Sequence, residues 1–452
     1  MRRLTTISLL LILSLPGADL WGQEPLTLEQ AVGIALDKNP ALRATAEEAT
    51  VARARTRQAQ AARLPRIDFV QGFTRGNNPV YVFGTLLTQR QFSAANFGLP
   101  GLNAPTPLDN FQTRFEGQWL LFDGNRTRHR VSGAKQLETA ADFETEQARQ
   151  DLILRVVRVY YGVLVARENL AAAREAVRSA EANERRVETL EKAGLVVTSD
   201  LLSERVFRAQ IKEREIRAEN ALELARMTLG HELGLGPDAA KEPSGSLAGL
   251  PMDLPPLEEM ERIALAERPA LRAAEFQKKA ADKNSGVAKS EFAPRVGVFA
   301  NFERDAETLS GPSGTNWTAG ARLEWNIFAG AADRYRLVET KARERQAANQ
   351  LEWLRSGVRL EVRQAYLETK AAGLRVEAAR EAVAQARESL RIIQNRYEAG
   401  LTTMTELLRA QSAQLDVSTA YLAALHDWQT ARAQLERAAG RLQEDSSLIQ
   451  GR

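Results

Sequence analysis

Hydrophobic positions in this chain follow two periods that alternate in a fixed order. From residue 30 to residue 63, apolar residues recur every three to four positions, which is typical of an amphipathic helix. The Thr27-Leu-Glu-Gln30 capping box precedes this stretch, and Pro65 ends it. The same period recurs over 259–292. We therefore predict one helix of about 34 residues ahead of each alternating region.

A period of two follows each of these helices and predicts two β-hairpins, at 66–122 and 295–328. Each strand spans about nine to eleven residues, the length that crosses a bilayer when tilted in a barrel. A soluble sheet with one buried face has the same alternation, so the pattern alone leaves that alternative open. Near the strand ends, four aromatic residues are candidates for a membrane aromatic girdle: Phe115, Trp119, Trp317 and Trp325.

A helical stretch of unusual length follows each hairpin. Residues 125–193 and 331–399 each contain 69 residues without a proline, and at 1.5 Å per residue each predicts a helix of roughly 100 Å. The helices that return, at 200–233 and 406–439, are about half as long. We expect each long helix to pack beside two half-length helices that are stacked end to end.

The seam of the second long helix steps by three and four residues, as in a coiled coil. Its members are Val376, Ala379, Val383, Ala386, Leu390, Ile393 and Tyr397. The first long helix keeps this spacing over 170–180 and then breaks at Glu184. We therefore expect the distal seam of the first helix to be looser.

These elements belong to an internal two-fold repeat. Trp119-Leu-Leu-Phe-Asp-Gly124 returns as Trp325-Asn-Ile-Phe-Ala-Gly330, 206 residues later, whereas Pro65-Arg66 returns as Pro294-Arg295, 229 residues later. The first copy thus carries 23 extra residues, in its loop at about residues 75–110. The predicted divisions are a signal peptide at 1–22, repeat 1 at 23–233, a linker or equatorial segment at 234–257, repeat 2 at 258–440 and a tail at 441–452.

The first 22 residues resemble a secretory signal peptide. Arg2 and Arg3 precede an apolar run at 7–15 that is too short to span a membrane. The chain has no cysteine, so we expect neither disulfides nor a lipid on an N-terminal cysteine. We predict an exported protein that carries a cleaved signal peptide and is not lipidated.

Composition changes this picture little. The net charge of +3 is the difference between 61 basic and 58 acidic residues that are interspersed along the helices, so we expect no nucleic-acid partner. No phosphate loop, nucleophile elbow or zinc motif is present in the sequence. We therefore predict no enzyme activity, no catalytic residue, no metal site and no cofactor.

Four strands cannot close a barrel, and open sheet edges are not tolerated in lipid. The smallest outer-membrane barrels have eight strands, so strands that lie in a membrane require several chains to share one barrel. A strand cylinder prolonged by roughly 100 Å of helix is a conduit. The sequence thus predicts an oligomeric α+β membrane protein.

Several motifs resemble those of TolC-like outer membrane efflux proteins. They are the Leu28-Glu-Gln-Ala-Val-Gly-Ile-Ala-Leu36 segment with Asn39-Pro40, the duplicated Trp-x-x-Phe-x-Gly strand ends, and the tips around Gly194-Leu195 and Gly400-Leu401. The resemblance implies a homotrimer with a 12-stranded β-barrel in outer membrane lipid, continued by a long α-helical coiled-coil barrel through the periplasm. It also implies a passive exit duct for efflux or type I secretion. A periplasmic adaptor (membrane fusion protein) opens such a duct, and an inner-membrane pump of the RND or ABC type energises it.

The resemblance assigns roles to both tips. Gly194, Leu195, Gly400 and Leu401 become the surfaces that contact the adaptor, although glycine is also the ordinary residue where a helix must reverse. Five residues become a periplasmic gate: Asp200, Tyr397, Thr402, Glu406 and Arg409.

The gate residues depart from the family pattern at two positions. Arg409 stands where a second acidic residue is expected, and Thr402 replaces an arginine. Glu406 has a structural alternative as part of a Thr403-x-x-Glu406 capping box. Tyr397 and Asp200 keep positions from which they can bond across helices. The alternative function is a soluble periplasmic coiled-coil adaptor, a class that usually has one helical hairpin rather than two.

Overall fold

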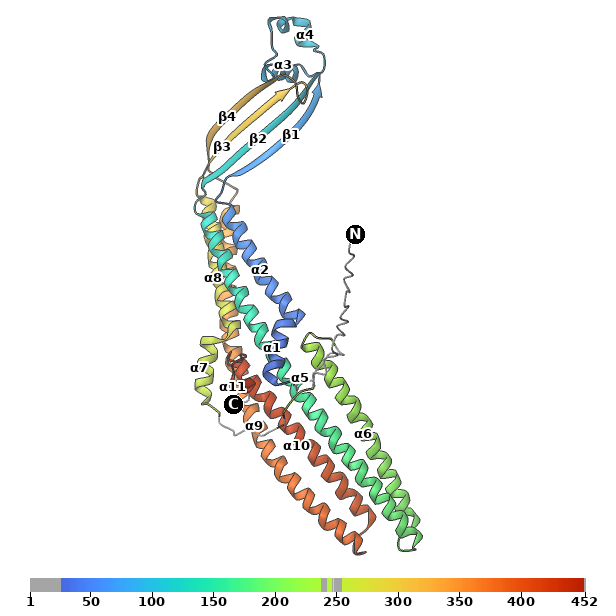
Figure 1. Cartoon of the computed structure of the whole chain (residues 1–452). Helices are drawn as coiled ribbons and strands as arrows, with labels where there is room; N and C mark the ends of the chain where they lie inside the picture. Colours follow the sequence, from blue (N-terminus) through green and yellow to red (C-terminus); the bar gives the residue numbers. More distant parts are fainter. Residues whose placement is uncertain (1–25, 237–241, 246, 248–253, 451–452) are drawn as a thin grey trace, which may run out of the picture.

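The computed structural model describes residues 26–236, 242–245, 247 and 254–450. The predicted signal peptide at 1–22 and parts of the predicted linker and tail lie outside the described residues. Those described form an elongated rod of helices with a four-stranded sheet at one end (Figure 1). Among them, no helix is both long enough and apolar enough to cross a membrane.

The two repeats form the same succession of elements. The first contains α1 (Leu28–Lys38), α2 (Pro40–Ala61), β1 (Arg66–Gly76), β2 (Leu108–Phe122), α5 (Arg126–Lys192) and α6 (Thr198–Glu232). The second contains α7 (Leu257–Glu267), α8 (Pro269–Lys289), the 3-10 helix η3 (Ser290–Phe292), β3 (Arg295–Ala306), β4 (Ser313–Glu324), α9 (Ala332–Glu398) and α10 (Met404–Ala438). A short helix, α11 (Ser447–Gln450), follows. Both α5 and α9 have 67 residues, and the predicted α+β class is confirmed.

The helix that precedes each hairpin is broken in two, so the prediction of one continuous helix over 30–63 and over 259–292 is wrong. Pro40 and Pro269 stand at the first position of α2 and α8, where the missing amide hydrogen does no harm. A proline there ends the helix before it. Asn39 caps α2, because its side-chain oxygen accepts hydrogen bonds from two free N–H groups at 3.0 and 3.2 Å.

These breaks are the joints at which the half-length helices stack. The side chain of Asn39, between α1 and α2, donates a hydrogen bond to the carbonyl of Glu232 at the end of α6 (2.9 Å). Arg268, between α7 and α8, donates to the carbonyl of Ala438 at the end of α10 (3.3 Å). The two joints are equivalent in the repeat although the donors differ, and each continues a return helix into the helix ahead of a hairpin.

A glycine in the left-handed conformation makes each joint possible. Gly234 has φ +69°, and a Cβ there would lie 2.6 Å from the carbonyl oxygen of Lys38. Gly440 has φ +78°, and its Cβ would lie 2.7 Å from the Cα of Arg268. Any larger residue would push the stacked helices apart, so both positions require glycine.

The seam of the first long helix is tighter than expected. Val187, which lies beyond Glu184, is 2% exposed and packs with Leu201 of α6 and with Met404 and Leu407 of α10. In the second long helix, the distal seam residues 390 and 393 stay partly exposed. The expectation of a looser first seam is wrong, because the first turn of α10 packs on α5 and closes it.

The strands form one antiparallel sheet in the order β1-β2-β3-β4, so the hairpins of the two repeats lie side by side. The outer edges of β1 and β4 have no partner among the described residues. The strands have 11, 15, 12 and 12 residues, so β2 exceeds the predicted nine to eleven by four residues and β3 and β4 exceed it by one. Because β4 ends at Glu324, Trp325 lies beyond the strand.

The extra residues of the first copy form helices rather than a plain loop. Between β1 and β2 lie α3 (Pro79–Thr88), the 3-10 helix η1 (Ala94–Phe97) and α4 (Leu99–Asn103). Residues 307–312 alone join β3 to β4. In Figure 1, α3 and α4 lie at the end of the sheet that is remote from the long helices, where the longer loop was expected.

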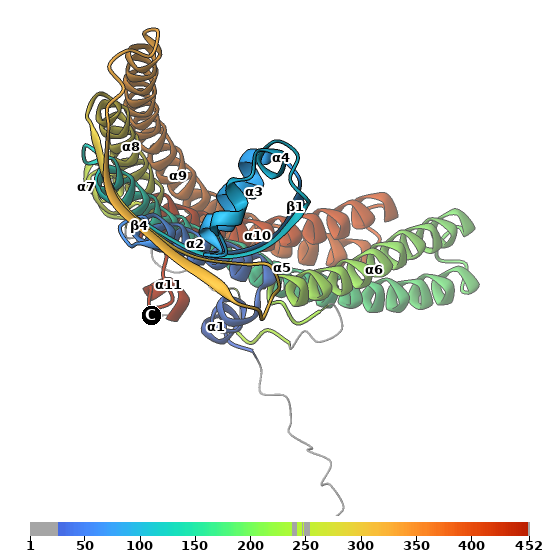
Figure 2. The ribbon, with the colours of Figure 1, turned by 90° about the horizontal axis from the view of Figure 1, so that it is seen from above.

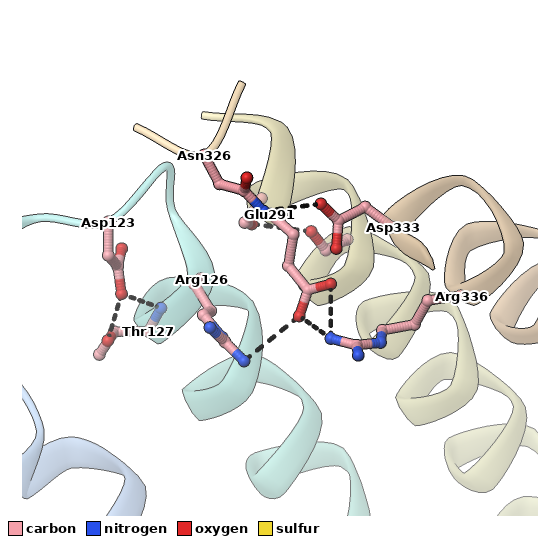
Figure 3. Close-up of polar contacts among 9 residues, drawn as sticks. Asp123, Arg126, Thr127, Glu291, Asn326, Asp333 and Arg336 are labelled. Carbon is pink, nitrogen blue, oxygen red and sulfur yellow. Dashed lines mark hydrogen bonds and ion pairs between the residues drawn. The ribbon is translucent and has the colours of Figure 1, made fainter. Parts of the chain in front are cut away.

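The other end of the sheet enters the long helices through a polar junction (Figure 3). Glu291 of η3 is buried and accepts hydrogen bonds from Arg336 of α9 (2.7 and 2.8 Å) and Arg126 of α5 (3.4 Å). The carboxylate of Asp123, just after β2, accepts hydrogen bonds from the backbone N–H (2.7 Å) and the hydroxyl (2.6 Å) of Thr127, and so satisfies a free N–H in the first turn of α5. One carboxylate therefore ties the long helices of both repeats together below the sheet.

The repeated tryptophan motif anchors the strand ends at this junction. The indole N–H of Trp119 donates to the carbonyl of Arg63 (2.9 Å), and that of Trp325 donates to the carbonyl of Phe292 (3.1 Å). Both carbonyls lie just ahead of a strand and are equivalent in the repeat. The motif glycine, Gly124, has φ +65°, and a Cβ there would lie 2.5 Å from a neighbouring alanine side chain. The motif thus specifies the turn from strand to helix.

Candidate functional site

One face of the sheet is apolar and exposed across all four strands. The strand registers align a row of aromatic residues on this face: Phe69, Phe115, Phe302 and Trp317. Between 47% and 77% of each of these residues is exposed. Trp119 lies on the same face, closer to the long helices, and is 45% exposed. A sheet in water buries such a face, so this face needs a lipid or protein cover.

The opposite face of the sheet is polar. It carries Asp68, Gln112, Arg114, Glu116, Asn301, Glu303, Thr318 and Arg322. Arg114 lies 2.9 Å from Glu116 and 3.7 Å from Glu303, so charges of both signs pair across it. Helix α3 packs on this polar face, and Figure 2 shows α3 within the curve of the strands. The polar face is therefore concave and the apolar face convex.

Each helical hairpin reverses at a glycine, as predicted for a helix C-terminus. Gly194 has φ +72° and Gly400 has φ +69°. The next residue in each tip, Leu195 or Leu401, donates its N–H to a carbonyl five residues back, at 2.9 and 2.8 Å. Leu195 is 72% exposed and Leu401 is 67% exposed. The tips thus present matched apolar side chains at the far end of the rod.

The predicted gate residues lie around these tips. Thr403 caps α10 by accepting the N–H of Glu406 at 3.3 Å, which is one of the two bonds of the predicted capping box. The Glu406 carboxylate lies 3.4 Å from Arg409, one turn along the same helix. Thr402 is half-buried beside the cap. Arg409 therefore offsets part of the negative charge of Glu406 within one chain.

The expected bond between Tyr397 and Asp200 is not formed in this structure. Among the described residues, the buried Tyr397 hydroxyl has no hydrogen-bond partner. Burial, with the carboxylates of Asp200 and Glu204 nearby, raises the pKa of Tyr397. Asp200 lies in the first turn of α6, whose N-cap residue, Val197, provides no side-chain cap. An acidic residue there stabilises the free N–H groups of the helix start.

Glu204 is a residue of this region that the sequence reasoning missed. It is 0% exposed, and neither carboxylate oxygen has a partner among the described residues. Burial, and secondarily the negative charge of Glu184, raises the pKa of Glu204 to about 7. The sequence does contain a signal of its burial, because Glu204 lies within the apolar stripe that Leu201, Phe207 and Ile211 form on α6. The equivalent residue of the second repeat is an alanine, at position 410.

A groove of about 690 Å³ runs between α6 and α10 just above the tips. Its apolar lining includes Leu202, Val206, Phe207 and Leu408, and Arg409 stands at its margin. Two ion pairs join the repeats in this part of the rod: Arg214 with Asp416, which lines the groove, and Arg186 of α5 with Glu398 of α9. Within the described ranges, no three histidine or acidic side chains are arranged to hold a metal ion.

Known proteins resemble this chain over most of its length. Residues 31–235 and 262–441 match the family described as Outer membrane efflux protein. Protein CyaE of Bordetella pertussis is 29% identical over 333 residues, or 72% of this chain and 69% of CyaE. Alkaline protease secretion protein AprF of Pseudomonas aeruginosa is 25% identical over 428 residues, or 91% of this chain and 84% of AprF. The Campylobacter jejuni CmeC outer membrane channel has the same fold, with a TM-score of 0.78 at 18% identity over 94% of this chain and 88% of CmeC.

The buried carboxyl of Glu204 predicts a pH-dependent stability. Below its ordinary pKa of 4.5 the group is protonated in both the folded and the unfolded state, so burial adds no charge penalty. Between 4.5 and about 7 only the unfolded chain loses the proton, so the free energy of unfolding falls as pH rises. At 1.36 kcal/mol per pKa unit, the loss is at most about 3 kcal/mol above pH 7.

We expect Glu204→Gln to melt at the same temperature as the parent protein at pH 4.5 and at a higher temperature at pH 8. Thermal unfolding followed by circular dichroism between these pH values measures this difference. Glu219→Gln is the matched control, because Glu219 lies on the same helix but its side chain is 66% exposed. If the melting temperatures of the parent protein and of Glu204→Gln changed with pH by the same amount, the prediction would be contradicted.

Proposed function

The chain belongs to the outer membrane efflux protein family, and we propose that three copies of it form one continuous duct through the outer membrane and periplasm. The observation that carries the proposal is the four-stranded sheet with an apolar convex face, a polar concave face and two unpaired edges. Its strands pair with those of neighbouring copies, so that three chains close a barrel of twelve strands. Lipid then covers the convex face, and water fills the concave side.

The direction of the strands supports this closure. Neighbouring strands in the sheet are all antiparallel, so β1 and β4 run in opposite directions. The β4 edge of one copy therefore meets the β1 edge of the next as a further antiparallel pair. All ladder hydrogen bonds are then satisfied around the ring, which a membrane-embedded sheet requires.

The helical rods support the length of the duct. Each 67-residue helix measures roughly 100 Å, and both point away from the sheet in the same direction (Figure 1). Residues 1–22 deliver the chain to the periplasm as a cleaved signal peptide, and the mature protein carries no lipid. The duct itself is passive, so an inner-membrane pump of the RND or ABC type supplies the energy. The name of AprF supports secretion as well as efflux as the transport class.

The alternative of a soluble periplasmic adaptor has little support. The family match covers both repeats, and both contribute strands to a sheet whose exposed face is apolar. An adaptor in water has no cover for that face.

The tips and the groove above them support docking of a periplasmic adaptor. Leu195 and Leu401 are exposed at the very ends of the hairpins, and Val197 beside them is 61% exposed. The groove between α6 and α10 offers Leu202 and Leu408 to the apolar stripe of a partner helix. Buried apolar contacts and two exposed ion pairs join the two hairpins, so an inserted helix that separates them opens the entrance.

For the duct, we expect the protein to partition with outer membranes and to run on gels as a trimer that dissociates on heating. In planar bilayers the purified trimer should conduct ions. Sedimentation of membrane fractions, heated and unheated gels and bilayer recordings check this result. A monomer in the soluble periplasmic fraction would refute the proposal.

For the gate, we expect Glu406→Gln to lower the cation preference of the pore and Arg409→Ala to raise it, each by about twofold, because a ring of like charges selects ions. Arg409 now lies 3.4 Å from Glu406 and offsets its charge. Reversal potentials in a salt gradient measure the preference. Glu377→Gln is the control, since Glu377 forms a similar exposed pair with Arg380 away from the tip. Reversal potentials equal to that of the parent in both tip variants would leave Glu406 with no role beyond the start of α10.

For the adaptor surface, we expect Leu401→Asp to abolish export while trimers still form, because it puts a charge into an apolar contact. Substrate accumulation in cells that carry the matching pump measures export. Leu309→Asp is the matched control: Leu309 is 63% exposed, against 67% for Leu401, but lies at the opposite end of the molecule. Normal export by Leu401→Asp would rule out this tip as a docking surface.

A further inference from the structure

The segment 77–107, which only the first hairpin carries, begins with α3, which packs against the outer end of the polar face, and α4 lies farther from the long helices (Figure 1). The segment leaves β1 at Gly76 and is held there by Tyr81, whose hydroxyl donates to the carbonyl of Thr74 at 2.9 Å. Asn78 caps α3 by accepting two backbone N–H groups at 3.0 and 3.2 Å. The start of α3 is thus bound to the first strand.

A buried polar cluster pins the end of α3 to the two central strands. Gln89 is 2% exposed, and its amide donates to the carbonyl of Asp109 (2.8 Å) and the side chain of Asn110 (3.0 Å) on β2. Asn110 in turn donates to Asp305 of β3 at 2.8 Å. Gln112 donates to the same carboxylate oxygen at 3.2 Å. These side chains belong to the polar face, so α3 lies on its concave side.

The segment also reaches the far edge strand. Arg90 donates to the carbonyl of Thr315 on β4 (2.9 Å), and the side chain of Asn316 donates to the carbonyl of Thr88 (3.3 Å). A Cβ at Gly314 would lie 1.8 Å from that Thr88 carbonyl oxygen, so only glycine permits this contact. Arg90 itself has φ +58°, a conformation that is unfavourable for a side-chain residue. The segment is therefore held directly to β1, β2 and β4, and it is linked to β3 through Asn110.

The remainder of the segment has its own small core and an exposed apolar surface. Phe92 contacts Phe83 and Phe97 edge to face, with ring centroids 4.7 and 5.2 Å apart. Val80 and Leu99 lie outside this core and are 82% and 72% exposed, and Phe97, at its edge, is 65% exposed. A segment with this internal support keeps its shape when water surrounds it.

We propose that segment 77–107 is a crossbar inside the outer mouth of the channel, which narrows the opening and limits the size of the solutes that pass. The proposal rests on the proposed function, because the polar face of the sheet is the wall of the lumen only in the closed barrel. Three crossbars, one from each chain, then project from the wall and present their apolar side chains to the passing solute. Pore diameter and lining control passage through such a constriction.

The first experiment removes the crossbar. In a hairpin-swap variant, 77–107 is replaced by 307–312, the short turn of the second hairpin. We expect the single-channel conductance in planar bilayers to rise by about twofold or more, because the narrowest part of the outer mouth is gone. The hairpin-swap variant should also admit larger polyethylene glycols, added on the outer side, than the parent channel admits.

The second experiment leaves the fold intact and uses the absence of cysteine from the chain. Leu99→Cys introduces a single thiol on α4. A bulky thiosulfonate reagent added on the outer side should lower the conductance in up to three steps, one for each chain. Leu309→Cys is the control, since Leu309 is 63% exposed in the short turn that lacks a crossbar, and its modification should leave the conductance unchanged.

The outcomes separate the two proposals. A parent protein that forms no pore overturns the proposed function and the crossbar with it. A conducting parent channel whose conductance does not respond to modification of Leu99→Cys overturns the crossbar alone, whether or not the hairpin-swap variant folds. A hairpin-swap variant that conducts with the parent conductance and the parent polymer limit overturns it as well.

Discussion

Backbone hydrogen bonding at the sheet edges is the constraint on which the rest of the structure depends. The outer edges of β1 and β4 present rows of N–H and C=O groups that hydrocarbon cannot satisfy. A protomer with an apolar convex face is therefore incomplete alone. Each further feature of the sheet end serves this closure: the antiparallel order that lets one edge meet the next, the tryptophan anchors that fix strand height, and the Glu291 junction that joins both repeats beneath the sheet.

The internal repeat solves the same packing problem twice with different residues. At one joint Asn39 bonds the carbonyl of Glu232, and at the other Arg268 bonds that of Ala438. The backbone geometry is preserved by a left-handed glycine in both, whereas the polar donor has changed. The repeats also differ near the tips: Glu204 is buried where the second repeat has an alanine, at position 410, and Arg409 pairs with Glu406. The shared parts build the wall, and the unshared parts are available for regulation.

The periodicity of the sequence predicted the long helices and the four strands, because an element with one apolar face has apolar residues at regular intervals in the sequence. It did not predict features that depend on packing between distant segments. The Asn39-Pro40 break was readable in local terms, and the same Asn-Pro pair at 78–79 marks the start of α3. Burial of Glu204 was harder to predict, since it depends on which stripe of α6 turns inward. The gate bond between Tyr397 and Asp200 failed for a related reason: matching positions do not ensure matching side-chain distances.

The two hairpins of each chain differ in what lies above them, because only the first carries segment 77–107. A ring of three chains contains six hairpins whose strands contribute in nearly the same way to the wall of the barrel. Its rim, however, alternates a bulky hairpin with a bare one. In the proposed trimer, the rim remote from the long helices therefore has three bulky segments and three short turns in alternation. Any agent that recognises this surface, such as an antibody, meets three identical epitopes at 120° rather than a uniform collar of six.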